Sequence, residues 1–351
     1  MIGPRWGQRL GMPVVVALVA TGLVALVLAI AGYDVGAAAT AAFDGAFGSS
    51  FAILSATLKR AAPLLLLGVA VAVAFRAGVL NIGAEGQFLA GAAAAVAVGL
   101  HTPVDSTAVT LLLELSAAVI AGAGWSGLAA LLKVRFGVSE VVSTLLLNFV
   151  ALNGVGYLVR GPLQESTHAF PMTSELPAGA RLPLLFDGQR LHWGFPIALA
   201  VALGAWWVFN HTAAGFRARI TGYSTHAAES AGRIAVDRVQ MRALLASGAI
   251  AGVAGFCEAA GVTYALFEGL SPGYGYAAIG VALLGRLHPI GIVGSAIFFG
   301  ALGAGADAMQ RDAGIPSEFA SVLAAVIILG VLAIPSIRSE SAEPLRSRLV
   351  R

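Results

Sequence analysis

FRAGVLNIGAEGQFLAG, residues 75–91, is a polar and glycine-rich interruption between two segments that are apolar enough to lie in lipid. The apolar run before it, residues 61–75, would rise only about 22 Å as a helix, against a hydrocarbon core of about 30 Å. This length predicts a helix that is too short to cross. Irregular backbone at membrane depth is tolerated only where it is buried in protein or lines a water-filled cavity. The interruption therefore indicates a position inside a membrane protein.

Two helix ends are predicted to meet within this interruption. Arg76 and Gly78 are the last-turn cation and the left-handed terminator typical of a helix C-terminus, and Asn81 offers a side-chain oxygen to cap the next helix. Glu85 and Gln87 add polarity in the first turns of that helix. The alternative is an ordinary loop at the membrane surface, with Glu85 in water. We favour the buried position because the following helix carries three closely spaced glycines, Gly83, Gly86 and Gly91.

The composition is that of an integral membrane protein. Of 351 residues, 58% are hydrophobic and 11% charged, where a soluble domain carries about 25% charged residues. The 44 glycines suit membrane helices whose backbones touch. A net charge of +3 gives no support to nucleic-acid binding, and the single cysteine, Cys257, excludes an intramolecular disulfide. Six scattered histidines lack metal-ligand spacing, so the sequence predicts no metal site.

The hydropathy and charge pattern predicts a single all-α membrane domain over residues 1–351, with about ten transmembrane helices, some short or broken. Both termini are expected to be cytoplasmic, although Lys59 and Arg60 then lie outside, against the charge rule. Residues 161–193 are expected to form an extracytoplasmic loop, residues 211–242 a cytoplasmic loop and residues 336–351 a cytoplasmic tail. The expected spans are residues 11–32, 61–75, 81–100, 109–132, 140–159, 194–210, 243–266, 277–285, 290–306 and 319–334.

Two of these runs, residues 61–75 and 277–285, are unusually short, and each is the second or third segment of one five-helix half. The two halves are expected to have opposite orientations, as in transporters built from inverted repeats. Paired short segments of this kind point to a transport pathway. The two halves are not visibly alike in sequence, so the repeat is inferred from topology alone.

The cytoplasmic loop contains HAAESAGRIAVDR, residues 226–238, within the strongest positive cluster of the chain. Residues 225–232 are rich in helix formers and predict a short helix with a small-residue face, flanked by arginines. Such a helix suits docking into a groove of a partner protein. The alternative is a plain surface loop whose arginines only fix the orientation of the chain in the membrane.

Four blocks in order carry a family resemblance: FRAGVLNIGAEGQFLAGA, VRFGVSEVVSTLLLNFVA, HAAESAGRIAVDR with SGAIAGVAG, and AAIGVALLGRLHPIG. Together they resemble the permease subunits of bacterial ABC importers for nucleosides, a branch of the group that also imports ribose, other simple sugars and branched-chain amino acids. NIGAEGQ after FRAG resembles the longer of two paired permeases. The resemblance implies a bacterial plasma (inner) membrane location. It also implies three partners: an ABC ATPase, a second, different permease and an extracytoplasmic substrate-binding protein.

The resemblance assigns ATPase coupling to five residues of the cytoplasmic loop: Ala227, Ala228, Glu229, Ala231 and Gly232. Glu229 and Ser230 replace an aromatic residue usual at this point of the family pattern. The chain has no GxxxxGK[ST] phosphate loop, so ATP hydrolysis is expected on the partner and this subunit is expected to be no enzyme and to need no cofactor.

Five polar residues within apolar segments are candidates for the translocation pathway: Asn81, Glu85, Gln87, Asn148 and Glu258. Each has a structural alternative. Glu85 suits a helix N-terminus, Asn148 suits a hydrogen bond between helices, and Glu258 suits either that bond or the pathway.

The function expected is ATP-driven import of nucleosides by alternating access. Two alternatives stay open: a ribose or simple-sugar permease of the same architecture, and an ion-coupled carrier that works without an ATPase. The ion-coupled carrier requires an intramembrane carboxylate, for which Glu258 and Asp307 are available.

Overall fold

The computed structural model describes residues 21–102, 106–230, 234–316, 318–319 and 322. Secondary structure in these residues is helical, apart from two isolated β-bridges. Within the same residues, six helical segments are long and apolar enough to cross a membrane: Ala52–Arg76, Thr107–Phe136, Glu140–Arg160, Gly194–His211, Val236–Thr263 and Pro289–Ala313. This confirms the prediction of an all-α integral membrane protein. The expected span at residues 319–334, the first half of the span at residues 11–32 and the tail at residues 336–351 fall mostly or wholly outside the described residues.

The described residues form two compact units, of which the smaller comes from both ends of the chain, before Leu58 and after Gly300. In it, helix α2 (Val35–Phe47) packs closely on the last part of α12 (Pro289–Ala313), where Gly45 faces Ala308. Leu28, Ala38 and Ile315 form a small hydrophobic core. Asp34 caps α2, accepting hydrogen bonds from the backbone N–H groups of Gly36 and Ala37.

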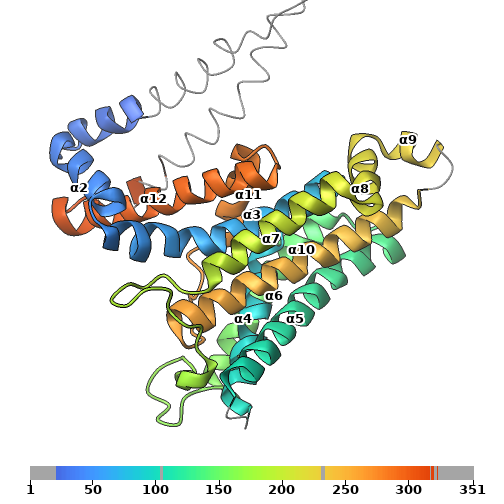
Figure 1. Cartoon of the computed structure of the whole chain (residues 1–351), viewed down its shortest axis with the longest axis horizontal. Helices are drawn as coiled ribbons and strands as arrows, with labels where there is room; N and C mark the ends of the chain where they lie inside the picture. Colours follow the sequence, from blue (N-terminus) through green and yellow to red (C-terminus); the bar gives the residue numbers. More distant parts are fainter. Residues whose placement is uncertain (1–20, 103–105, 231–233, 317, 320–321, 323–351) are drawn as a thin grey trace, which may run out of the picture. The chain divides into compact units, whose positions relative to one another are not determined.

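The larger unit, Leu58–Gly300, carries most of the helices (Figure 1). Its central helix α10 packs against α3, α4 and α5, and α7 packs against α3 (Figure 1). The helices of this unit are α3 (Lys59–Arg76), α4 (Ala84–His101), α5 (Thr107–Phe136), α6 (Glu140–Arg160), α7 (Gly194–His211), α8 (Ala213–Tyr223), α9 (Thr225–Ser230), α10 (Val236–Glu258) and α11 (Tyr274–Leu284).

Glycine lets α10 approach its neighbours to backbone contact. A Cβ atom on Gly252 would meet the carbonyl oxygen of Ala118 in α5, and a Cβ atom on Gly255 would meet that of Phe88 in α4. Gly91 of α4 faces Gly252 in turn. Lipid tails are as apolar as the helices, so no hydrophobic driving force holds membrane helices together. Small residues at the helix interfaces therefore stabilise the contact by allowing close van der Waals packing. The core of this unit is therefore built on backbone-to-backbone packing.

The prediction that residues 61–75 are too short to span was wrong. The helix begins at Ala52 as a π-helical segment (Ala52–Leu58) and runs on through α3 to Arg76, 25 residues in all. Its first turns carry polar residues, but Ser55 and Thr57 are buried, and the Thr57 hydroxyl donates to the backbone oxygen of Ala46. Polar side chains that turn inward lower the hydropathy of a segment without shortening its helix. The second short run is confirmed: α11 has 11 residues.

The segment between α6 and α7 has little regular structure and is fastened to the chain that follows α10. Backbone N–H groups of Thr173, Leu176 and Leu182 donate to the carbonyl oxygens of Leu266, Tyr264 and Ala260, respectively. The prediction of one long loop over residues 161–193 therefore corresponds to an ordered segment with one short 3-10 turn, Ala178–Ala180.

Candidate functional site

Helix α3 ends as the sequence predicts, at a left-handed glycine. Gly78 has φ of +74°, and Arg76 lies in the last turn. The N–H of Val79 donates to the carbonyl oxygen of Ala74 at 3.2 Å, and that of Gly78 to Phe75 at 3.1 Å. This is the paired hydrogen bonding of a Schellman motif, which satisfies carbonyl groups at a helix C-terminus. The chain then crosses an irregular stretch before α4 begins at Ala84.

Asn81 lies at the centre of this irregular stretch, fully buried. Its Nδ2 donates to Gln87 Oε1 at 2.9 Å and to Ser247 Oγ of α10 at 2.8 Å. Its Oδ1 accepts from the Gly83 N–H at 2.9 Å and from Gln87 Nε2 at 3.0 Å. The prediction that Asn81 caps α4 was wrong, because Gly83 is the N-cap residue and Asn81 instead holds the turn before it. Asn81 and Gln87 thus form a reciprocal amide pair, tied to α10 by Ser247.

Asn148 of α6 supplies the cap that α4 lacks in its own sequence. Its Oδ1 accepts from the Gly86 N–H at 2.8 Å, one of the N–H groups that a helix start leaves without an intrahelical partner. Its Nδ2 donates to the Ile82 carbonyl oxygen at 2.9 Å and to the Tyr276 hydroxyl at 3.3 Å. Asn148 therefore satisfies backbone groups on both sides of the start of α4.

Glu85 joins the start of α4 to the start of α11. Its Oε2 accepts from the Gly275 N–H at 2.6 Å, in the first turn of α11. A carboxylate is stabilised at a helix N-terminus by free N–H groups and by the helix dipole. A Cβ atom on Gly275 would overlap the Glu85 backbone, so the two helix starts lie in close contact. The interruption before α4 and the second short segment, 190 residues apart, therefore meet at one place.

Four of the five pathway candidates form this single cluster, which we call the polar junction: Asn81, Glu85, Gln87 and Asn148, with Ser247. Asn81, Gln87 and Asn148 are 0%, 1% and 2% exposed, and their polar atoms are satisfied by one another and by nearby backbone. Glu258 is not part of it. It is the last residue of α10, about 16 Å along the helix from Ser247, within electrostatic range of Lys59 and Arg60.

The coupling candidates lie on and after α9, a six-residue helix. Ala227 and Glu229 are exposed and Ala228 is buried, whereas Ala231 and Gly232 fall outside the described residues. Helix α8, just before α9, contacts the end of α3. A Cβ atom on Gly222 would overlap the Arg76 carbonyl oxygen, and one on Gly78 would lie 3.2 Å from the Gly222 Cα atom. The chain next to α9 therefore touches the interruption that leads into the polar junction.

Comparison of the sequence with known proteins identifies the family of this chain. Residues 53–332 match the model of the family described as branched-chain amino acid transport system / permease component. This chain belongs to that permease family. A guanosine ABC transporter permease, NupP of Bacillus subtilis, is 37% identical over 336 residues, covering 94% of this chain and 95% of its own. A glucose ABC transporter permease of Haloferax volcanii is 33% identical (93% and 87% covered), and the nucleoside permease NupB of Lactococcus lactis is 30% identical (82% and 80% covered).

Membership makes the chain a permease subunit of an ABC transporter, a transport component rather than an enzyme. The ion-coupled carrier expected as an alternative is set aside by this finding. Sequence reasoning missed Ser247 of the permease's polar junction and the two residues of α11 that bond to the junction, Gly275 and Tyr276. Ser247 is the one hydroxyl residue among the alanines and glycines of α10. This polar residue in an apolar helix was the signal in the sequence for a hydrogen bond between helices.

Proposed function

We propose that the permease forms the membrane pathway of an ABC importer for nucleosides. The support is the series of relatives whose names specify guanosine or nucleoside transport, together with the near full-length match to the guanosine permease. The structural support for a pathway through the membrane is the polar junction. Buried hydrogen-bonding groups from four helices, α4, α6, α10 and α11, converge there in an otherwise apolar membrane protein.

The polar junction is proposed as the part of the pathway that rearranges. Asn81 and Asn148 hold backbone groups around the start of α4, and Gln87 holds the Asn81 side chain in place. Those backbone groups could be satisfied equally by water or by the hydroxyl groups of a passing ribose. In the closed form the side chains satisfy the backbone themselves. Glu258, farther along α10 and next to Lys59 and Arg60, is proposed as a separate polar site nearer the other mouth of the pathway.

ATPase coupling is proposed to enter through α9. Ala227 and Glu229 are exposed on α9 and are proposed to face a groove in an ATPase, and Ala228, Ala231 and Gly232 are the other residues of this coupling segment. Movement of α9 reaches α8, whose Gly222 lies against the Arg76 carbonyl and Gly78. From there the displacement passes to the interruption that contains Asn81. Contact between two glycine backbones transmits such a movement directly, because no flexible side chain lies between them to absorb the displacement.

The proposed assembly follows from this role. The permease pairs with a second, different permease, an ABC ATPase and an extracytoplasmic substrate-binding protein in the bacterial plasma (inner) membrane. The complete chain, residues 1–351, is proposed as one transmembrane domain with about ten helices in two inverted halves and cytoplasmic termini. Residues 161–193 then face outside, and residues 211–242 and 336–351 face the cytoplasm.

Uptake in cells tests the substrate. Labelled guanosine and labelled glucose are supplied to cells that lack the chain and to cells complemented with it. Loss of guanosine uptake alone, restored by complementation, supports the nucleoside pathway. Loss of glucose uptake alone moves the assignment to the sugar branch, which the 33% identical glucose permease favours as the second candidate. If both uptakes persist, neither substrate class is carried by this permease.

A further inference from the structure

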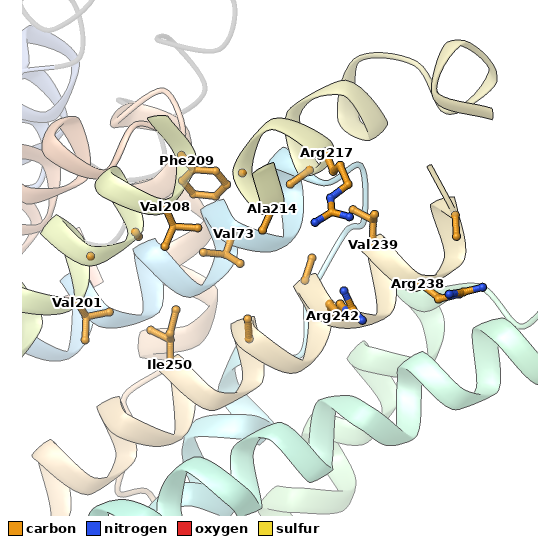
Figure 2. Close-up of a pocket in the computed structure, with 17 residues that line it drawn as sticks. Val73, Val201, Val208, Phe209, Ala214, Arg217, Arg238, Val239, Arg242 and Ile250 are labelled. Carbon is orange, nitrogen blue, oxygen red and sulfur yellow. The ribbon is translucent and has the colours of Figure 1, made fainter. Parts of the chain in front are cut away.

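A groove of about 590 Å³ lies between α3, α7, α8 and α10, and none of its lining residues belongs to the polar junction. Figure 2 shows the 17 residues that line it. Three are arginines, Arg217, Arg238 and Arg242, and these lie together at one end of the groove (Figure 2). The other lining residues are all Ala, Gly, Val, Ile or Phe. The groove is thus amphipathic along its length, with a cationic end and an apolar body.

The arginines at this end have no carboxylate partner in the part of the chain that the structure describes. None of the three takes part in an ion pair among the described residues, and Arg217 Nε donates only to its own helix, to the Ala213 carbonyl oxygen at 3.2 Å. A fourth guanidinium lies nearby: Arg76 stacks over the ring of Phe209, a lining residue, at 4.7 Å, and its buried Nη1 has no hydrogen-bond partner. Uncompensated guanidinium groups beside a groove attract an anion, and their planar donors match the oxygens of a phosphate.

The length of the groove matches one leaflet of a bilayer. Along α10 it extends from Arg238 to Ile250, a rise of about 18 Å, where half of a hydrocarbon core is about 15 Å. The arginines mark the cytoplasmic end by the charge rule, so the apolar body points toward the bilayer midplane. Gly204 of α7 lines this body, and a Cβ atom there would meet nothing within 4 Å. The groove therefore has room beside α7 for a chain of methylene groups.

We propose that this groove holds an anionic phospholipid of the cytoplasmic leaflet, with its phosphate between the arginines and one acyl chain along α7 and α10. A nucleoside does not fit this lining, because its base and ribose need several donors and acceptors and the body of the groove offers none. A docking peptide would bring backbone groups that the apolar body leaves unsatisfied. Basic pockets between membrane helices on the cytoplasmic side suit lipid headgroups, and an acyl chain suits the remaining apolar wall.

The test is native mass spectrometry of the full-length permease. The permease is first exchanged into detergent micelles that contain phosphatidylglycerol and phosphatidylcholine in equal amounts, and it is then released from the detergent in the instrument. We expect one retained phosphatidylglycerol per chain and at least tenfold lower occupancy by phosphatidylcholine. The double variant Arg238→Gln/Arg242→Gln should lose occupancy at least tenfold. Arg135→Gln, which removes an exposed arginine at the end of α5, is the matched control and should retain the lipid. Equal retention of both lipids, or by the double variant, overturns the proposal.

Two further measurements keep the test independent of the folding of the arginine variants. A photoreactive anionic phospholipid with its label in the acyl chain should crosslink the unaltered permease on α7 or α10 near Val201 and Ile250. Gly204→Leu, which fills the groove, should reduce this crosslinking at least fivefold, whereas Gly154→Leu, at another open position on α6, should not. Crosslinks confined to other helices, or occupancy of the arginines by inorganic phosphate with no lipid bound, contradict the proposal. Displacement of the lipid by a partner subunit in the assembled transporter also contradicts it.

Discussion

Replacing Asn148 by Leu should destabilise the permease by about 2–4 kcal/mol. Leu has the same branching as Asn and a larger volume, so the change removes hydrogen bonds without opening a cavity. It leaves the Gly86 N–H and the Ile82 carbonyl oxygen, bonded to Asn148 at 2.8 and 2.9 Å, without that partner in a buried site. Each buried polar group left unsatisfied costs about 1–3 kcal/mol. Hydrogen bonds between membrane helices contribute less, about 0.6 kcal/mol on average, because the unfolded chain in the membrane finds other partners. We therefore use the lower half of the range, about 1–2 kcal/mol, for each of the two groups.

The free energy of unfolding is to be measured by titrating the purified permease from mild detergent into dodecyl sulphate, with helix content as the signal. Asn153→Leu is the matched control, since Asn153 is on the same helix, is exposed, and bonds only the carbonyl oxygen of Phe149 in its own helix. The control should change the free energy of unfolding by less than about 0.5 kcal/mol. Equal effects of the two variants would refute the argument that Asn148 caps α4, whatever their size.

Three other changes probe the remaining contacts. Gly222→Ala should lower uptake of the transported substrate at least tenfold while ATP hydrolysis by the assembled transporter continues, because the added methyl group separates α8 from the Arg76 carbonyl; unchanged uptake removes the α8 contact from the coupling route. Gly252→Ala should cost about 1–3 kcal/mol of unfolding free energy by pushing α10 from the Ala118 carbonyl, whereas Gly124→Ala, with open space around it, should be neutral. Burial, with a smaller effect from the charge of Lys59, lowers the pKa of His192 from 6.5 to about 4. The unfolded chain therefore binds more protons than the folded chain between these two pKa values, so the free energy of unfolding should fall by at most about 3 kcal/mol as pH drops from about 6.5 to about 4. His192→Gln should flatten that dependence in a pH series of the same unfolding titration.

Local signals predicted the helices that follow long apolar runs. Helices α5, α6 and α7 begin and end within a few residues of the expected bounds, since their hydropathy is continuous and their ends carry glycine or basic residues. The end of α3 at Gly78 was also predictable, because a left-handed glycine after a last-turn cation is a local motif. Information about these elements lies within a few residues of each boundary.

The start of the continuous helix Ala52–Arg76, ahead of α3, and the start of α10 were not predictable in this way. Helix α10 begins at Val236, seven residues before the expected start at residue 243, and carries Arg238 and Arg242 in its first two turns. A hydropathy window stops at such residues because it treats every side chain as facing lipid. In the structure these arginines reach the groove, and Ser55 and Thr57 before α3 turn inward. The environment of each side chain, which only the tertiary fold supplies, decides how far the helix extends.

The polar junction shows the same limit at longer range. The sequence identified Asn148 and Glu85 as polar residues in apolar segments, yet their partners lie 62 and 190 residues away. Every side-chain hydrogen bond of Asn148 and the bond from Gly275 to Glu85 join different elements. If these elements move apart during transport as proposed, the freed backbone groups must find water or substrate at that moment. An open form should therefore be hydrated at Gly86 and Gly275, and faster amide hydrogen exchange at these two residues during turnover is the measurement that would detect it.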